Sequence, residues 1–559
     1  MDSTILPALN PTSALIIATI LLALLYFSSH ILTAENWAHN VPQAPQEPLY
    51  SRLLQEPSHD ALRKWAETIP NSGLLLYRGL YKKPKILLTN TAAAQEVHQK
   101  RNQENGSGYK YEKESVVRKS LASLLGEGLV TAAGEEHKVQ RKLLQPVFKL
   151  RNVKNQYPLF WSKTRELVAA LQESASQDSS GKVELTGLVN RATLDIIGQA
   201  GFGLDFDCLA NPNNELWEEY AAAFRGAGNG SQHTGLLWST LARFLPRRVV
   251  EMLLSRRNEQ TKKAVGAVRR RIGNVIARKK NDAERLTNAR KDSVVIYDAK
   301  EQQSELLDAN EEDVNNNNDI ISQCIRSGIT DFEMLLEQSL AILGAGHETI
   351  AQTLCVAIFE LSKNKPLQDR LRAEIYDKLP WISQSREEQS PTESELDSIE
   401  TLQLLNAVCN ETLRMYPIIP SLVREAACDV ELLGHRIPKG TVIMTILPIF
   451  NRNPALWDQD TSLFNPDRWL VSANGGAKKR SAFMTFGHGP SACIGEKMAR
   501  SEMAILLAGL VAAFEVEFFG QGVDGKEKRE ELEFEWGVVY MIKGGLWMRL
   551  KPVGLECEN

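Results

Sequence analysis

Cysteine is scarce in this chain, and the few cysteines present are scattered. The 559 residues include seven cysteines, an odd number, and no Cys-x-x-Cys pair. This pattern argues against a disulfide framework and against a zinc site, and it suits a reducing compartment. Strong net charge is also missing. The formal net charge is only −4, so the composition gives no indication of nucleic-acid binding.

Basic residues are absent from the N-terminus, where no lysine or arginine precedes Arg52. The basic region that opens a secretory signal peptide is therefore missing, although a cleaved signal stays an alternative. Residues 14–32 are mostly apolar and approach the roughly 20 residues that span a bilayer. Because positive charges follow this run, we expect the body of the chain in the cytosol. We predict a transmembrane anchor over residues 1–34 and a stiff proline-containing hinge over residues 35–48.

The rest of the chain, residues 49–559, indicates one mainly helical domain with small β-sheets. Short strand-like runs occur near residues 73–89 and 427–445 and after 515. The clearest helix runs from Asp331 to about Lys363 and is apolar enough to pass through the core. Residues 281–318 are polar, nearly free of aromatics and end in four asparagines, so we expect a flexible surface insertion there.

The most informative stretch is residues 486–495, Phe-Gly-His-Gly-Pro-Ser-Ala-Cys-Ile-Gly. A glycine-rich turn presents Cys493 just before an apolar, helix-forming run, a position that lowers the pKa of a thiol. Gly489 would let the backbone approach something flat, and Phe486 would pack against the same object. A thiolate beneath a flat cofactor suggests a ligand of haem iron. Taken alone, a cysteine before a helix is more often a small buried hydrophobe.

The full pattern F-x-x-G-x-x-x-C-x-G resembles the haem-binding loop of the cytochrome P-450 family of haem-thiolate monooxygenases. Further motifs of that family follow the same order along most of the chain. The resemblance implies the mainly helical P-450 fold with small β-sheets, preceded here by one N-terminal transmembrane helix. It also implies haem b between the helix at 331–363 and the helix that starts at Ile494, with Cys493 as the axial iron ligand.

Residues 345–350, Ala-Gly-His-Glu-Thr-Ile, resemble the oxygen-binding helix of the family, [AG]-G-x-[DE]-T. The resemblance implies that Glu348 and Thr349 help to deliver the protons needed to split dioxygen. The Thr349 hydroxyl is also able to bond back to a carbonyl of the preceding turn and loosen the helix. Ile350 departs from the Thr or Ser common at its position. A glycine-containing helix with no catalytic role is the plainer interpretation of this segment.

Other motifs resemble the family's contacts to the haem propionates. His137 and Arg141, four residues apart on a predicted helix, resemble its H-x-x-x-R pair, and Arg424 matches another propionate ligand. Without the other motifs, the first pair would be an ordinary solvated helix face. Ser491 stands where the family usually has Arg or His, so that contact is lost or replaced by His488.

Two short motifs are expected to be structural. Glu411-Thr-Leu-Arg414 resembles the family's E-x-x-R, and the segment that contains Arg468 and Trp469 resembles its P-x-R-[FW]. The resemblance implies a buried Glu411–Arg414–Arg468 network that locks the segment leading to the cysteine loop. By itself, an E-x-x-R pair is more often a surface ion pair.

The implied function is that of a monooxygenase anchored in the endoplasmic reticulum membrane. It would hydroxylate or epoxidise a small, largely apolar organic substrate with O2, in a style similar to fungal enzymes of secondary metabolism. No flavin or nicotinamide domain is recognisable, so electrons are expected from a separate NADPH-cytochrome P-450 reductase, with cytochrome b5 as an optional second donor. A candidate docking face consists of basic residues near the cysteine loop: Lys478, Lys479, Arg480, Lys497 and Arg500.

Two alternatives to a monooxygenase stay open at this point. One is a haem-thiolate isomerase or dehydratase that needs no O2, which the intact Glu348–Thr349 pair disfavours. The other is a non-catalytic haem-binding membrane protein. The sequence does not identify the substrate.

Overall fold

The computed structural model describes residues 36–45, 56–99, 109–228, 247–294, 318–382 and 391–553, except positions 39, 80–82, 212, 459, 523–524, 526–530 and 537–538. The predicted anchor at residues 1–34 lies outside the described residues. The predicted hinge is only partly described, and its residues are not free. Val41 is buried, and the Ala44 N–H donates to the Leu76 carbonyl at 2.8 Å. Residues 41–44 therefore extend the edge of a sheet.

Helices make up most of the described chain. They are α2 His59–Thr68, α3 Thr91–Gln99, α4 Ser115–Leu125, α5 Gly134–Leu144, α6 Leu150–Lys154, α7 Tyr157–Ser176, α8 Leu185–Phe202, α9 Glu215–Gly228, α11 Arg247–Val294, α13 Ile320–Arg326, α14 Phe332–Gly346, α15 Glu348–Ser362, α16 Lys365–Lys378, α17 Glu393–Asp397, α18 Gln403–Met415, α19 Pro448–Asn451, α20 Asp467–Val471 and α21 Glu496–Ala513.

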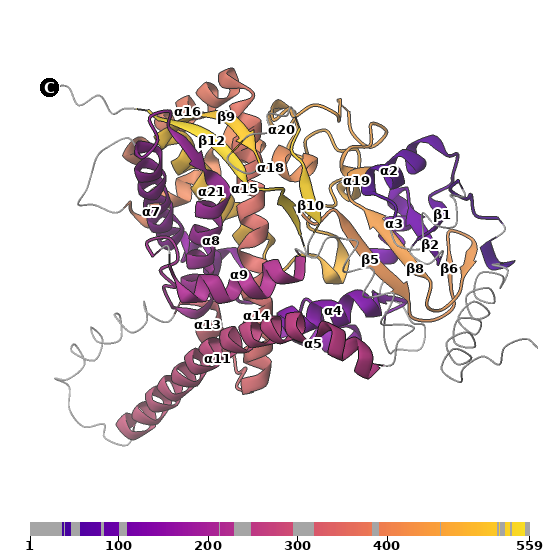
Figure 1. The fold of residues 1–559 in the computed structure, drawn as a ribbon, viewed down its shortest axis with the longest axis horizontal. Helices are drawn as coiled ribbons and strands as arrows, with labels where there is room; N and C mark the ends of the chain where they lie inside the picture. Colours follow the sequence, from indigo (N-terminus) through magenta and orange to yellow (C-terminus); the bar gives the residue numbers. More distant parts are fainter. Residues whose placement is uncertain are drawn as a thin grey trace, which may run out of the picture.

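The strands are short and form small sheets, as the sequence predicts. They are β1 Leu74–Arg78, β2 Pro84–Leu88, β3 Tyr111–Lys113, β4 Lys182–Glu184, β5 Ser421–Ala426, β6 Val430–Leu432, β7 His435–Ile437, β8 Val442–Ile446, β9 Phe514–Gln521, β10 Phe534–Trp536, β11 Tyr540–Ile542 and β12 Leu546–Pro552. The largest sheet has the order β1-β2-β8-β5-β3, in which only β2 and β8 are parallel. It lies to one side of the molecule with α2 and α3, and most helices lie on the other side (Figure 1).

The helix expected at 331–363 is present but broken. Asp331 caps α14 by accepting from the Met334 N–H, and the helical pattern is interrupted at His347, between α14 and α15. The Thr349 hydroxyl donates to the Ala345 carbonyl at 3.0 Å, as the sequence suggests, and such back-bonding loosens a helix. By length and composition the combined helix could cross a membrane, but 67% of its most apolar window is buried inside the protein, which is typical of a core helix.

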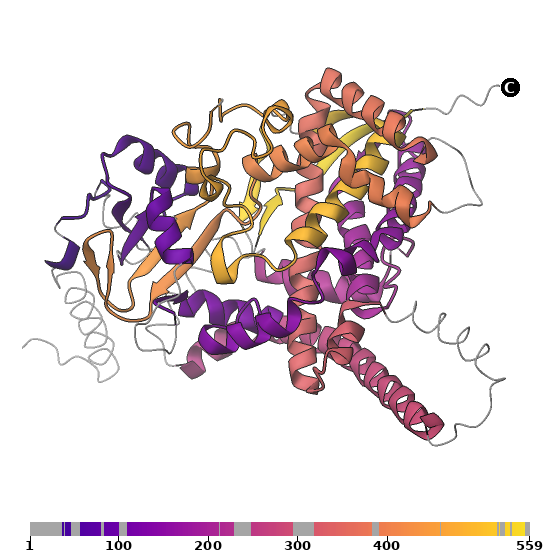
Figure 2. The ribbon, with the colours of Figure 1, turned by 180° about the vertical axis from the view of Figure 1, so that it is seen from behind.

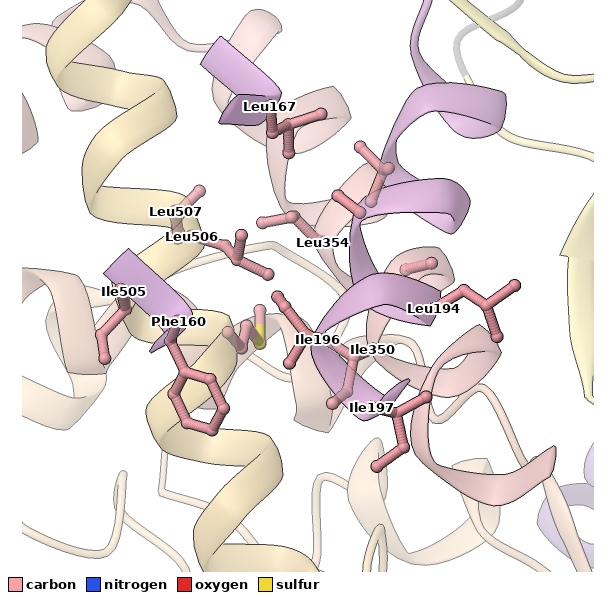
Figure 3. Packing of buried hydrophobic residues seen from close by; sticks show 14 of the residues in the cluster. Phe160, Leu167, Leu194, Ile196, Ile197, Ile350, Leu354, Ile505, Leu506 and Leu507 are labelled. Atoms are coloured by element: carbon pink, nitrogen blue, oxygen red, sulfur yellow. The ribbon is translucent and has the colours of Figure 1, made fainter. Parts of the chain in front are cut away.

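The main core surrounds α15, whose residues Ile350–Leu361 are all buried. Leucine and isoleucine side chains from α8, α15 and α21 meet Phe160 and Leu167 of α7 there (Figure 3). Seen from behind, α21 lies beside α15 (Figure 2). The core therefore fixes α21, and with it the start of the segment that follows the cysteine loop.

Part of the expected flexible insertion is helical. Residues 281–294 continue α11, a helix of 48 residues, and residues 295–317 lie outside the described residues. The prediction took the polar composition of residues 281–294 as a sign of flexibility. A solvent-exposed helix, however, needs no apolar residues on its outer faces. Lys279 on α11 pairs with buried Asp319 at 2.7 Å, which ties this part of the helix to α13.

Candidate functional site

The cysteine loop is held by its own backbone and by α3. The Cys493 N–H donates to the Phe486 carbonyl at 2.8 Å, which closes the turn that presents the thiol. Gly489 has a φ of +72°, and a Cβ added there would lie 2.1 Å from the His98 carbonyl oxygen. The space left by Gly489 is thus filled by the α3 backbone, and the glycine's expected contact with a cofactor stays a prediction. The Arg500 guanidinium lies over the Phe486 ring, with its central carbon 4.9 Å from the ring centroid.

Cys493 is an exposed residue, but the pKa of its thiol is raised rather than lowered. The main cause is the surrounding protein, which removes bulk solvent from the sulfur. The backbone N–H of Gly495 and the charge of Arg141 act in the opposite direction, and Glu496 in the first turn of α21 adds to the rise. The expectation of a lowered pKa was wrong because burial of the sulfur outweighs the backbone N–H of Gly495, and α21 itself begins only at Glu496, beyond the cysteine. A bound metal cation would reverse this balance, since coordination deprotonates a thiol.

Helix α5 brings His137 and Arg141 to different parts of the site. The Arg141 guanidinium donates to the carbonyl of Ala492, next to the cysteine, at 2.5 Å. Burial lowers the pKa of Arg141, while Cys493 and Tyr109 raise it. His137 is buried, and Tyr109 packs edge-on against its ring with 6.4 Å between centroids. Arg141 therefore supports the cysteine loop directly.

A small cavity of about 30 Å³ lies between β3, α5, β5 and the cysteine loop. It brings together three residues expected from the sequence, His137, Arg424 and Ser491. His488, the other candidate to replace the missing contact, is not among its lining residues. The lining residues are Val97, His98, Tyr109, Tyr111, Glu112, Lys113, Ala132, Ala133, Gly134, His137, Arg424, Pro490 and Ser491.

Positive charge dominates the polar lining of this cavity. Burial lowers the pKa of Arg424 to about 10, and among the described residues its side chain donates only to the neighbouring Val423 carbonyl, at 3.0 Å. None of the ion pairs among the described residues involves Arg424. The hydroxyls of Tyr109 and Tyr111 are buried and have no hydrogen-bond partner in the part of the chain that the structure describes. The cavity is thus chemically suited to an anion.

Sequence reasoning missed Tyr109, Tyr111 and Lys113. Their signal was available, since the alternation Tyr-Lys-Tyr-Glu-Lys over residues 109–113 places the first, third and fifth side chains on one face of a strand. Residues 111–113 form β3, and all three of the missed residues line the cavity.

The segment around Thr349 combines an open face with a packed one. Ala345 is exposed and Thr349 is half-buried, although α15 is otherwise deep in the core. Gly346 does not open this face: a Cβ there would lie 2.7 Å from the Ile197 side chain on α8. Ile350 also packs with α8 in the core (Figure 3), which accounts for an apolar residue at that position.

The predicted network of Glu411, Arg414 and Arg468 is present and fully buried. Arg414 makes a bidentate pair with Glu411, both N···O distances being 2.8 Å, and Arg468 Nε donates to the same carboxylate at 3.0 Å. The Trp469 indole N–H also donates to Glu411, at 3.0 Å. Arg414 further donates to the carbonyl of Asn451, whose side chain bonds Met484 and Thr485 just before the cysteine loop.

This geometry, a lone thiol on a glycine-rich loop beside a cationic cavity, agrees with the sequence comparisons. Residues 48–545 match the family model described as cytochrome P-450. The chain therefore belongs to the cytochrome P-450 family, whose members carry a haem-thiolate cofactor. It is a monooxygenase, and so an oxidoreductase.

Among its relatives, the chain is 34% identical to cytochrome P-450 monooxygenase sphH of Aspergillus fumigatus, over 90% of this chain and 85% of that protein. It is 32% identical to cytochrome P-450 monooxygenase FSL4 of Gibberella zeae, over 89% and 85% of the two chains. It is 30% identical to cytochrome P-450 monooxygenase FUM15 of Gibberella moniliformis, over 90% and 86%.

Proposed function

We propose that this monooxygenase binds haem b through the thiolate of Cys493 and transfers oxygen from O2 to a small, largely apolar organic substrate, by hydroxylation or epoxidation. The main support is the cysteine loop, in which a single exposed thiol is presented by a closed turn and braced by Arg141. The fungal monooxygenases among the relatives support a role in fungal secondary metabolism.

The residues of the cavity fit the two carboxylates of haem b. Arg424 is a half-buried cation that lacks an acidic partner among the described residues, and a carboxylate would supply one. His137 and Ser491 share the same cavity, and two tyrosine hydroxyls there lack partners within the described chain. We therefore assign Arg424 and His137 to the propionates, and Arg141 to the backbone of the cysteine loop.

When bound, the haem supplies the redox chemistry of oxygen activation. The chain contributes protons, and we assign their delivery to Thr349 and Glu348. The Thr349 hydroxyl rests on the Ala345 carbonyl at the helix break, beside the exposed Ala345, and a hydroxyl turns easily between two acceptors. The surrounding core excludes water from the rest of α15, so these protons have few other sources.

We infer that electrons come from a separate NADPH-dependent reductase, with cytochrome b5 as an optional second donor. Lys478, Lys479, Arg480 and Lys497 are exposed near the cysteine loop and would face an acidic partner. Arg500 contributes less, since it is half-buried and bonded to Glu496 and Asn410. We also propose that residues 1–34 anchor the protein in the endoplasmic reticulum membrane with the catalytic domain in the cytosol.

The assignment of Cys493 is tested by the spectrum of the reduced protein with carbon monoxide. Thiolate ligation gives a strongly red-shifted Soret band, which we expect in the wild type and not in Cys493→Ser. Cys428→Ser is the control, because that cysteine is half-buried and lies outside the loop. A red-shifted band in Cys493→Ser would show that another residue binds the iron.

The proton route is tested with isosteric variants one helical turn apart. Thr349→Val removes the hydroxyl, and we expect more of the NADPH consumed with a reductase to appear as hydrogen peroxide. Thr353→Val is the matched control, since the Thr353 hydroxyl bonds the Thr349 carbonyl at 2.7 Å and is buried. Equal peroxide yields in wild type and Thr349→Val would exclude this role.

A further inference from the structure

Lys113, at the end of β3, is bound by three backbone carbonyls and by no carboxylate among the described residues. Its Nζ lies 2.8 Å from the Leu129 oxygen, 2.7 Å from that of Val130 and 2.9 Å from that of Ala132. Three acceptors at these distances require three N–H groups, which only the charged ammonium offers. The observed position of the loop at residues 129–132 therefore depends on a protonated Lys113.

The surroundings of Lys113 oppose that charge. Burial and the nearby cations Arg424, Arg141 and Arg118 lower its pKa to about 7, and Glu136 raises it only slightly. No ion pair joins Lys113 to an acid among the described residues. The other ionisable side chains around the shared cavity are His98, Tyr109, Tyr111, Glu112 and His137. Near neutral pH, the charged form that the loop requires is only marginally favoured.

The loop held by Lys113 leads directly into α5. Ala132 is followed by Ala133, the residue that precedes α5, and α5 brings His137 to the cavity and Arg141 to the cysteine loop. An anion in the cavity would lie near the Lys113 ammonium and favour its charged form. The same anion would thereby strengthen the three bonds that position the start of α5.

We propose that Lys113 is a positioning residue that couples binding of a carboxylate in this cavity to the placement of the loop at 129–132 and of α5, so that cofactor retention consumes one proton. The proposal rests on the proposed function, in that the carboxylate belongs to the haem. It also explains how the site functions with Ser491 where a cation is usual, because the protonated Lys113 places a second positive charge beside Arg424 in the same cavity.

The sign of the pH effect follows from linkage. Without the anion, Lys113 loses its proton as the pH rises through about 7. With the anion its pKa is higher, so binding takes up a proton from solvent above pH 7 and weakens as the pH rises. For one proton, the affinity falls by at most tenfold per pH unit, until the pH passes the pKa of the bound state.

The test measures how fast haem leaves the purified full-length protein for excess apomyoglobin, between pH 6.5 and 9. In the wild type, we expect the rate to rise with pH above 7. Lys113→Met should lose haem at least tenfold faster at pH 7, with little dependence on pH. Lys113→Arg keeps a charge at every pH, so it should retain haem and also give a flat profile. Lys119→Met is the control, because Lys119 is exposed on α4 and lies outside the cavity.

A further variant separates charge in the cavity from support of the loop. Ser491→Arg adds a cation to the same cavity, so we expect it to slow haem loss in Lys113→Met without restoring the pH dependence. A wild-type profile in Lys113→Met or Lys113→Arg would overturn the proposal, because another group would then be titrating. A missing red-shifted carbon monoxide band in the wild type would instead overturn the ligation by Cys493.

Discussion

Two groups of charged side chains in this protein, one buried and one half-buried, are arranged in opposite ways. In the network around Glu411, one carboxylate accepts from Arg414, Arg468 and Trp469, and every contact is internal. In the cavity beside the cysteine loop, Arg424 and Lys113 face each other's positive charge, and no acid among the described residues pairs with either. Both groups lie close to the cysteine loop, so proximity does not explain the difference.

The difference indicates what each group does. A closed network holds its chain segments whether or not anything binds, because removing one member leaves a charge buried without a partner. An open set of cations costs stability until an anion arrives, and it is therefore the part of the site that responds to a ligand. The first group fixes the path of the chain before the loop, and the second is suited to the carboxylates of the cofactor.

The largest effect is expected from opening the closed network. Glu411→Ala would leave Arg414 and Arg468 buried without a counter-charge, which costs about 3–5 kcal/mol of folding stability. We expect poor expression and an earlier unfolding transition in urea, followed by circular dichroism. If Glu411→Ala unfolded at the wild-type urea concentration, the network would not be the internal brace described here.

The opposite result is expected from Arg424→Met in the open set. A charge-assisted bond is worth about 1.5–3 kcal/mol, so haem should leave roughly ten to a hundred times faster. The folded protein should keep its helical circular dichroism, because a half-buried cation without an acidic partner among the described residues has been removed. If Arg424→Met unfolded as early as Glu411→Ala instead of losing haem, the two groups of charges would have the same structural role.

An intermediate effect is expected from Arg141→Met. This change removes one donor to the Ala492 carbonyl, so the cysteine loop should loosen while the cavity keeps Arg424, Lys113 and His137. We expect a partial loss of the red-shifted carbon monoxide band on standing, and a smaller increase in haem loss than Arg424→Met gives. A larger increase would place Arg141 on the cofactor carboxylates instead.

The smallest effect should come from Trp469→Phe. It removes one N–H donor to Glu411, but both arginines remain, so the cost should be about 1 kcal/mol in urea unfolding. Haem content should not change. A loss of haem in this variant would show that the closed network also senses the cofactor.

The sequence was sufficient for the features that depend on local spacing. The helical character, the short strands, the cysteine turn and the Glu411–Arg414 pair all follow from residues that are close along the chain. The back-bond of Thr349 could also be foreseen, because its acceptor is four residues away.

Features that depend on distant segments could not be predicted in the same way. The pKa of the Cys493 thiol is raised by burial among segments that are distant along the chain. A side chain is excluded at position 489 by the close approach of the His98 carbonyl on α3. The alternation at residues 109–113 indicated Lys113, but its carbonyl partners at residues 129–132 could not be foreseen, because they meet it only in the tertiary structure. The helix over 281–294 was missed because apolar content was taken as the requirement for order.

The parallel pairing of β2 with β8 also determines when the largest sheet can finish folding during synthesis. The pairing partners of β2 residues Lys85, Ile86 and Leu87 are synthesised much later. These partners are Val442, Ile443 and Met444 of β8. At about 5–20 residues per second, translation from Leu88 to Val442 takes roughly 20–70 s. During that interval β1 and β2 have an unpaired edge, which invites mispairing with other chains. Cys493 emerges later still, so the proposed ligand of the haem iron becomes available only after this interval.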